Sequence, residues 1–595
     1  MDRKSILALI LIAVVIILMP YYQKMIVGDK YYEQMARVKQ DSVAQTAPLE
    51  EKNRVIGKEI KSAPVKVDAA QPLGKTAEKE ETEKQVKVKQ DSSEKIFTIE
   101  NDRILVKISN KGGGGLREFI LKNYTKYDSS RVNMISPEIK NNLYLGFQDN
   151  SGDFIETNDY LFFSDSRYEK KYLRQGEVYK ISFSLKINSG ELRKTYIFYD
   201  NKYHFDVVVQ FSNPHQMLLN DTYRFGWTNG LPSTESYVED DNNYNQVNIY
   251  IGDELEQFNI TDAGRTPEIS LTGRAEWFAI RTKYFLAAVS NVSANVDDGV
   301  YYSGLGIQRS DYVQRLYDVG FNVRVKDMYN SDTLRVYLGP LDHKELVSYG
   351  KELDLLIMNN GWYERTFRFF SLIILQVLEF MHGFIPNYGI VIIIFSILIK
   401  LIVYPLTKKS YQSMKEMQKI QPLVQELKEK YKSDPQRMNK EMMKLYKEHG
   451  VNPMGGCLPM LLQMPLLFAL FIVFRSTIQL RGATFIPGWI DDLSRSDTLF
   501  HLPFSLPFYG NEFNVLPILM MVTMIFQSKM TMQDPKQKLM VYIMPVFMLL
   551  IFNRFPAGLN LYYTMFNLLT IIQQKFVHVE EIKPASKSKA KKKKR

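Results

Sequence analysis

Apolar residues crowd into the two ends of this chain of 595 residues, while the long middle alternates apolar with polar positions. The first apolar run extends from residue 6 to residue 19 after a short basic start. It ends at Met19 and Pro20, without the small residues of a signal-peptidase site and without a cysteine for lipid attachment. We therefore expect residues 1–22 to form an uncleaved signal-anchor transmembrane helix with its basic start in the cytoplasm.

The segment after this run, residues 23–95, is rich in Lys, Glu, Gln and Ala and has few aromatic residues. Such a composition buries too little apolar surface to offset the entropy that is lost when the chain becomes ordered. We expect a charged, flexible tether here.

Residues 96–355 contain many short alternations of apolar and polar side chains, as in FTIENDRILVKIS and YKISFSLKI. A period of two predicts strands with one buried face, and the Gly, Asn and Asp between the runs predict tight turns. Many short strands of this kind are typical of an antiparallel β-sandwich. The glycines at 112–115 lack the Lys and Ser/Thr of a phosphate-binding loop and precede another strand, so we interpret them as a turn.

Helical patterns follow the strands. Residues 356–386 place Arg, Glu and His among bulky apolar side chains, which predicts an amphipathic helix at the membrane interface. The region 387–578 should form a helical core with five further spans, and the spans are expected at about 389–409, 457–479, 513–529, 539–555 and 559–576. The predicted fold class is a polytopic α-helical membrane protein of six spans with a large extracytoplasmic all-β sandwich domain.

The charge of the connecting loops orients these spans. Segment 408–456 has eleven Lys or Arg residues and the tail 579–595 is polybasic, whereas segment 480–512 has only Arg481 and Arg495. Because basic loops stay in the cytoplasm, both termini should be cytoplasmic and the β domain should lie on the opposite side.

One residue interrupts the apolar pattern of the second span. Lys400 lies among Ile, Leu and Val, where a charge costs roughly 2.5–3.5 kcal/mol on insertion scales. It lies roughly 10 Å from the cytoplasmic end of the span, so its side chain reaches the interface only if the helix tilts. Ser396 and Tyr404 stand four residues before and after it, which predicts a polar stripe along one helical face. Lys400 therefore either snorkels to the interface or faces a water-filled cavity.

The last span has a similar polar stripe. Tyr563, Asn567 and Thr570 recur at steps of three and four residues, and Gln463 lies near the start of the third span. Because polar groups are costly against lipid, these side chains should face one another or water; simple hydrogen bonding between helices is the alternative. The spans contain no acidic residue that could neutralise Lys400, which favours a cavity that attracts a negatively charged guest.

The segment 408–456 predicts a basic, Met-rich helical hairpin. The motif Ser-Asp-Pro at 433–435 ends the first helix and begins the second, with proline in the first turn. The apolar seam is expected at Met417, Val424, Leu427, Met438 and Met442. This hairpin is either packed on itself or an adaptable binding surface.

Several kinds of chemistry are not expected from this sequence. The single cysteine, Cys457, excludes an intrachain disulfide and a multi-cysteine metal site. No cluster of His, Asp or Glu has the spacing of metal ligands, and no pair of carboxylates has the pattern of a hydrolase. We expect neither a metal nor a cofactor nor an enzymatic activity.

Three motifs resemble one known family. YPLTKKSYQSMKEMQKIQP, VNPMGGCLPMLLQMPLLFALF and FPAGLNLYYTMFNLLTIIQQ, in this order, are similar to the YidC membrane protein insertases in their long Gram-negative form. The resemblance implies a five-helix core around a hydrophilic groove that is open to the cytoplasm and to lipid, and a periplasmic domain of the sugar-binding β-supersandwich type. Lys400 stands where the family has its basic groove residue, which is more often arginine. The groove lining implied by the resemblance is Ser396, Gln463, Tyr563, Asn567 and Thr570.

The resemblance implies an insertase and chaperone of the inner membrane that works without nucleotide, alone or with the Sec translocon. Its partners would be nascent membrane proteins, the lipid bilayer and the ribosome, the last through the basic tail and the cytoplasmic loops. Two other interpretations stay open at this point. One is a secondary transporter with Lys400 as the counter-ion of its substrate, although the spans show no internal repeat. The other is a glycan-binding envelope protein or enzyme anchored by its helices.

Overall fold

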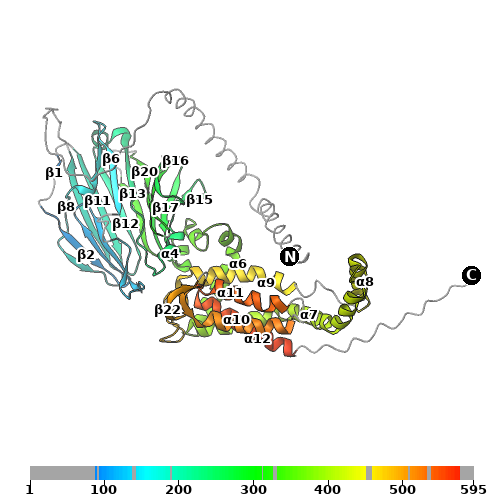
Figure 1. Cartoon of the computed structure of the whole chain (residues 1–595). Coiled ribbons are helices and arrows are strands. Elements are labelled where there is room, and N and C mark those ends of the chain that lie inside the picture. The colour runs from blue at the N-terminus through cyan, green and yellow to red at the C-terminus, as the bar shows by residue number, and fades with distance from the viewer. Residues whose placement is uncertain are drawn as a thin grey trace, which may run out of the picture. The chain divides into compact units, whose positions relative to one another are not determined.

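The computed structural model describes residues 88–89 and 93–576, apart from 137–141, 188–189, 311, 326–330, 450–457, 507–508 and 532–537. The predicted anchor, nearly all of the tether and the polybasic tail lie outside the described residues. Within the described part of the chain, a β-rich region is followed by a helical region (Figure 1).

One large antiparallel sheet forms the base of the β-rich region. Across the sheet its strands are β1 (Val88–Lys89), β10 (Val178–Ile187), β11 (Gly190–Tyr199), β12 (His204–Ser212), β21 (Ser331–Pro340), β18 (Phe285–Asn291), β17 (Ala275–Arg281), β14 (Gln246–Ile251) and β15 (Glu254–Phe258), with β8 (Phe163–Ser164) also paired to β10. Buried residues alternate with more exposed ones along β10 and β11, as the period-two sequence pattern predicts.

Two smaller sheets cover one face of this large sheet. The six-stranded sheet has the order β16 (Gly264–Leu271), β19 (Val300–Gln308), β20 (Val313–Arg324), β13 (Thr222–Trp227), β6 (Leu143–Gln148) and β7 (Phe154–Glu156). The five-stranded sheet has the order β5 (Arg131–Asn133), β4 (Gly115–Thr125), β3 (Ile104–Ser109), β2 (Ile96–Glu100) and β9 (Lys170–Tyr172). Phe205 and Phe211 lie on the same face of β12, and their rings contact Phe119 of β4 and Phe147 of β6. The large sheet therefore contacts both smaller sheets through the same face.

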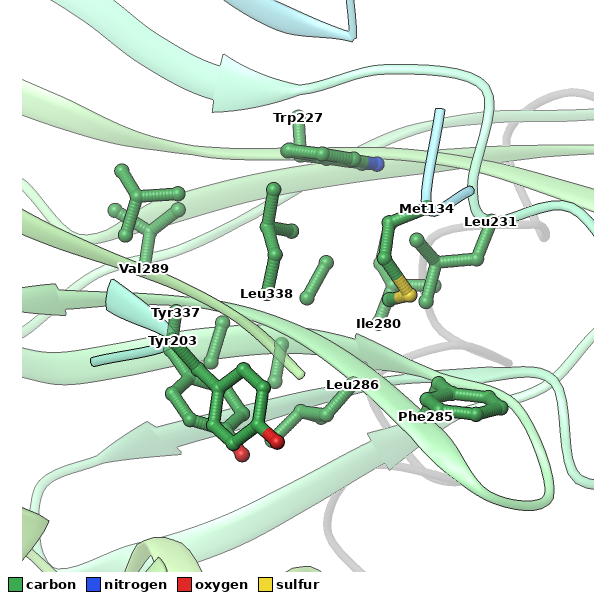
Figure 2. Close-up of a cluster of buried hydrophobic side chains, with 14 of the residues drawn as sticks. Met134, Tyr203, Trp227, Leu231, Ile280, Phe285, Leu286, Val289, Tyr337 and Leu338 are labelled. Carbon is green, nitrogen blue, oxygen red and sulfur yellow. The ribbon is translucent and has the colours of Figure 1, made fainter. Parts of the chain in front are cut away.

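The core of the β region lies between these sheets. Figure 2 shows Trp227 of β13 across from Leu338 of β21, with Val289 of β18 nearby, and all three side chains are buried. Each such large apolar side chain stabilises the fold by roughly 1.5–3 kcal/mol when it is fully buried. Tyr337, the neighbour of Leu338, points to the opposite face of the sheet and contacts Tyr349 of α5 (His343–Tyr349). The predicted β-sandwich is confirmed for the described residues.

Short helical turns connect the strands. They are η1 (Thr157–Asp159), α3 (Pro214–Met217), η2 (Leu219–Asp221) and α4 (Val238–Asn243), while η3 (Leu353–Leu356) follows α5.

The glycine run at 112–115 is a tight turn, as predicted. Gly112, Gly113 and Gly114 have φ angles of 76°, 62° and 92°, a conformation that residues with a Cβ rarely adopt. A Cβ on Gly114 would lie 2.1 Å from the ring of Tyr196 on β11. The turn therefore needs glycine both for its backbone conformation and for its close approach to the large sheet.

The helical region consists of α6 (Trp362–His382), α7 (Tyr388–Lys430), α8 (Pro435–Glu448), α9 (Leu458–Ser476), α10 (Val515–Thr531), α11 (Lys538–Phe552) and α12 (Ala557–Phe576). Between α9 and α10 lie η4 (Ile478–Leu480) and the hairpin of β22 (Thr498–Leu506) and β23 (Gly510–Asn514). Helix α12 packs against α7, α9 and α10, and α6 packs against α7 and α9. Helix α12 is therefore at the centre of the bundle.

Helix α7 joins two elements that the sequence analysis treats separately. The predicted second span and the first helix of the hairpin form one continuous helix of 43 residues, which begins after Asn387 and includes Pro405 and Pro422. The Asn387 side chain caps it by accepting hydrogen bonds from the backbone N–H groups of Gly389 and Ile390. The first helix of the hairpin and the segment that carries Lys400 thus belong to one helix.

Membrane-spanning character is clearest in α7. In the described part of the chain, Tyr388–Pro405 is the one stretch long and apolar enough to cross a membrane, with a mean hydropathy of 2.3. Shorter apolar stretches lie in Met464–Ser476, Val515–Met530 and Val541–Phe552. The helical core is confirmed, and the count of six spans stays a prediction.

Buried ion pairs join the β region to the helical region. Arg481, which follows α9, donates to the carboxylate of Glu235 at 2.7 Å, and both side chains are more than nine-tenths buried. Arg475 at the end of α9 pairs with Asp240 of α4, which also pairs with Lys283 at 2.8 Å. The Arg481 and Glu235 charges need partners because they are buried, whereas Arg475 and Asp240 are only partly buried.

Candidate functional site

Lys400 turns into the helix bundle and not toward its surface. Its residue is 7% exposed, and its Nζ donates a hydrogen bond of 2.7 Å to the hydroxyl oxygen of Thr570 on α12. Thr570 in turn donates to the backbone carbonyl of Phe566. The contact joins two helices that are 170 residues apart in the sequence and fixes the lysine on the α7–α12 seam.

The charge of Lys400 is only partly compensated. Its Nζ lies 4.3 Å from the ring centre of Phe566 and 5.7 Å from that of Tyr411, distances at which cation–π attraction contributes roughly 0.5–2 kcal/mol each. Among the described residues Thr570 is its one hydrogen-bond acceptor, and no carboxylate forms an ion pair with it. An ammonium group has three N–H donors, so this arrangement leaves capacity for an anionic or polar guest.

Polar groups continue along the seam toward the C-terminal half of α7. The side chain of Gln573 donates from Nε2 to the hydroxyl of Thr407 at 3.1 Å. The Oε1 of Gln573 and the amide of Gln574 are buried without a hydrogen-bond partner among the described residues. Buried amides of this kind are costly unless water or a ligand satisfies them. The seam is thus a polar strip inside an otherwise apolar bundle.

Toward the N-terminal end of α7 the same seam contains polar groups with fewer hydrogen bonds between helices. Ser396 is fully buried and its hydroxyl donates to the carbonyl of Ile392 in its own helix. Asn567 donates from Nδ2 to the hydroxyl of Thr523 on α10 at 3.4 Å. The hydroxyl of Tyr563 is buried and has no partner among the described residues.

The structure brings some of the predicted groove residues together and leaves others apart. Lys400 and Thr570 are in direct contact, and Ser396, Asn567 and Tyr563 are on the same two helices. Tyr404 is 41% exposed, and its contact with the cluster is through its backbone carbonyl, which accepts a hydrogen bond of 3.1 Å from the hydroxyl of Thr407. Gln463 lies in α9, but its side chain is outside the described residues.

Sequence reasoning missed the residues that continue the stripe beyond Lys400. Thr407 and Tyr411 follow Lys400 by seven and eleven residues, which brings them back to its face because seven residues complete nearly two turns. Tyr404 lies eight residues after Ser396, and eight residues of an α-helix turn about 80° beyond two full turns. Tyr404 therefore points away from the face that carries Ser396. Steps of seven and then four residues from Lys400 along the same helical face lead to Thr407 and Tyr411. Phe566 cannot be found in this way, because its side chain is apolar.

The predicted hairpin is present and packs on itself. Val424 and Met442 are buried between α7 and α8, while Met417, Leu427 and Met438 are half-buried. Asp434 caps α8 by accepting from the backbone N–H of Arg437, and Pro435 occupies the first turn as expected. Met443 is half-exposed and Met417 and Met438 are partly exposed, so part of the Met-rich surface is accessible.

Two family comparisons cover the described chain almost end to end. The family described as YidC periplasmic domain matches residues 96–371. The family described as 60Kd inner membrane protein matches residues 380–584. The first match covers the β-sandwich with the start of α6, and the second covers the helices that hold the Lys400 cluster.

Curated relatives agree with these matches. A membrane protein insertase YidC of Chlorobaculum parvum is 34% identical over 97% of this chain and 94% of its own length. A protein of the same name from Chloroherpeton thalassium is 33% identical over 99% of both chains. A solved structure of an active YidC insertase aligns with 82% of this chain and 96% of its own, at 19% identity and a TM-score of 0.34.

Proposed function

Since this chain belongs to the YidC family of membrane protein insertases, we propose that the Lys400 cluster is the charged part of a hydrophilic groove that receives the polypeptide to be inserted. The observation that carries the proposal is the hydrogen bond from Lys400 to Thr570, which holds a lysine without a carboxylate partner among the described residues inside a bundle of apolar helices. A charge is retained in such a place when it has a function to perform.

The substrate enters as a short hairpin whose outer segment is polar or acidic. The Lys400 ammonium attracts that segment because no carboxylate among the described residues competes for it. Water and the amides of Gln573 and Gln574 replace part of the hydration that the segment loses. The polar segment then crosses a thinner apolar layer, which lowers the free-energy barrier for its passage across the membrane.

The free energy for insertion comes from the substrate. Each large apolar residue of its transmembrane helix gains roughly 0.3–0.6 kcal/mol on entering the bilayer centre. A helix of about 20 such residues therefore supplies enough driving force without nucleotide hydrolysis. We expect a non-enzymatic role for the whole chain.

The membrane arrangement that fits this role has six spans, cytoplasmic termini and a periplasmic β-sandwich. The insertase is a membrane protein, and the loop charges described above support this orientation. In this arrangement the hairpin of α7 and α8 is cytoplasmic, where it receives nascent membrane proteins from the ribosome, with the polybasic tail as a second contact. The Sec translocon is the proposed partner for larger substrates.

Reversal of the groove charge tests the proposal. In proteoliposomes, Lys400→Glu should lower insertion of a substrate with an acidic outer segment by about tenfold or more, since a charge-assisted contact contributes roughly 1.5–3 kcal/mol. Lys400→Arg should keep most activity, because it keeps the charge. Lys408→Glu is the matched control: it makes the same charge change at an exposed position of α7 and should have little effect.

A substrate with the same apolar helix and a neutral outer segment completes the test. Lys400→Glu should affect its insertion much less. Equal loss for both substrates would mean that the variant damages the bundle and not an electrostatic contact with the substrate. Full insertion of the acidic substrate by Lys400→Glu would remove the proposed role of the lysine.

A further inference from the structure

Helix α6 has one face in the protein and one face of exposed aromatic side chains. Glu364, Ser371 and Leu375 are buried against the rest of the chain. The opposite face exposes large apolar side chains at helical spacing, namely Trp362, Phe369, Phe370, Ile373 and Phe380. Five residues separate the end of α6 at His382 from Tyr388, where the membrane-spanning part of α7 begins. Exposed aromatic side chains next to a membrane span are typical of helices that lie in the interfacial layer of a bilayer.

A cavity of about 500 Å³ opens beside this face. Its lining combines two cationic side chains with apolar ones, and consists of Leu255, Leu355, Asn359, Arg365, Arg368, Phe369 and Leu372. Phe369 is 69% exposed and belongs both to the aromatic face and to the cavity wall. The cavity thus continues the membrane-facing surface, and its size is in the range of small-molecule sites.

Of the two arginines in the cavity, Arg368 has a carboxylate partner, whereas the partners of Arg365 are neutral amides. Arg368 pairs with the carboxylate of Asp354 at 3.1 Å. Arg365 donates from Nε to the Asn359 side chain at 3.2 Å and from Nη2 to the Gln257 side chain at 3.0 Å. Both acceptors of Arg365 are neutral, and none of the carboxylates described in the structure forms an ion pair with it. The cavity therefore holds one uncompensated positive charge on a side chain that two amides keep in place.

We propose that this cavity binds the headgroup phosphate of a membrane phospholipid. The planar guanidinium of Arg365 matches phosphate oxygens, and two fixed hydrogen bonds reduce the entropy that it loses on binding. The acyl chains of the lipid lie along Phe369 and the neighbouring exposed aromatic residues. A free phosphate ester would use the charge of Arg365 but leave this apolar wall exposed, so the amphipathic lining favours a lipid. The site is separate from the Lys400 cluster and does not depend on its role.

Native mass spectrometry of the full-length protein in detergent tests this site. The protein is titrated with phosphatidylglycerol and, in parallel, with a diacylglycerol of the same chains, which lacks the phosphate. Phosphatidylglycerol should bind more tightly, and Arg365→Gln should weaken it about tenfold, the usual effect of losing a charge-assisted hydrogen bond. Arg365→Lys keeps the charge but loses the planar guanidinium and its two fixed hydrogen bonds, so its affinity should lie between those of Arg365→Gln and the unchanged protein.

Two further variants separate the site from general effects. Leu255→Trp narrows the cavity without changing its charge and should also weaken binding of the lipid. Arg274→Gln removes an arginine that is 73% exposed elsewhere in the β region and should leave affinity unchanged.

Three results would overturn the proposal. Equal affinity of Arg365→Gln and the unchanged protein would show that the guanidinium does not bind the headgroup. Equal binding of diacylglycerol would show that the phosphate is not recognised. Displacement of the lipid by millimolar glycerophosphate would assign the cavity to a soluble phosphate ester and not to a membrane lipid.

Discussion

A lysine inside the β-sandwich provides a quantitative test of the energetics of the fold. Lys194 on β11 is almost fully buried, and its Nζ donates one hydrogen bond of 2.7 Å to the carbonyl of Gly112 in the glycine turn. Burial lowers the pKa of Lys194 from 10.5 to about 7. The folded protein therefore binds the proton of this lysine less tightly than the unfolded chain does.

This difference makes stability depend on pH in a predictable direction. Above pH 10.5 the lysine is neutral in both states and costs nothing through its charge. As the pH falls toward 7 the unfolded chain gains the proton first, so the free energy of unfolding decreases by about 1.4 kcal/mol per pH unit. Between pH 9 and pH 7 the loss from Lys194 is about 2.3 kcal/mol, because the folded lysine begins to bind its own proton near pH 7.

The variant Lys194→Met removes this term. The difference in free energy of unfolding between the variant and the unchanged protein should shift in favour of the variant by about 2–3 kcal/mol from pH 9 to pH 7. Chemical unfolding of the full-length protein in detergent, followed by the fluorescence of the buried Trp227 and Trp277, measures it. Groups that titrate equally in both proteins cancel in this difference.

Lys180→Met is the control, because Lys180 is exposed on the neighbouring strand β10. Its difference from the unchanged protein should be small and constant with pH. If the Lys194→Met difference is also constant between pH 7 and pH 9, the lysine keeps its charge in the folded state and the reasoning is wrong.

Two other predictions concern stability. Arg481→Leu should destabilise the full-length protein by roughly 1–3 kcal/mol in the same assay, because the buried Glu235 carboxylate loses its 2.7 Å ion pair and keeps only the longer one, with Arg495 at 3.6 Å, and the hydroxyl of Thr234; a loss below about 1 kcal/mol would show that water reaches the pair. Gly114→Ala should lower stability by at least about 1–3 kcal/mol, since its φ of 92° and the Tyr196 ring both exclude a Cβ. Gly152 has a φ of 88° but open space around it, so Gly152→Ala introduces backbone strain without a clash and should lower stability less than Gly114→Ala. Equal losses of stability for the two variants would contradict the proposed clash with Tyr196.

The sequence predicts the parts of this fold that depend on local patterns. Period-two alternation identifies the β-sandwich, the glycine run marks a turn, and Asp434-Pro435 marks the start of α8. These features follow from backbone preferences and from which face of an element is buried. The continuity of α7 was not predicted, because the change from apolar to basic residues near 405 looks like an element boundary while the helical backbone runs through it.

The candidate site is predictable only in its charged and polar members. Lys400 is conspicuous in sequence because its charge interrupts an apolar run, and Thr570 belongs to a polar stripe with helical spacing. Their contact depends on how α7 and α12 pack, which one sequence without coordinates does not specify. For the same reason Phe566 gives no signal, although its ring is the nearest to the ammonium among those that contact it. The Arg365 cavity likewise needs the β region and α6 to meet.

Photo-crosslinking from α12 to a stalled nascent membrane protein tests the central claim most directly. A photoreactive residue at position 570 lies beside Lys400 in the buried seam, whereas one at position 568 of the same helix replaces the exposed Leu568. The proposed groove predicts strong crosslinks to the polar outer segment of the substrate from position 570 and weak ones from position 568. Substrate crosslinks from position 568 alone, with none from position 570, would show that the polypeptide passes along the lipid-facing side and that the buried lysine does not receive it.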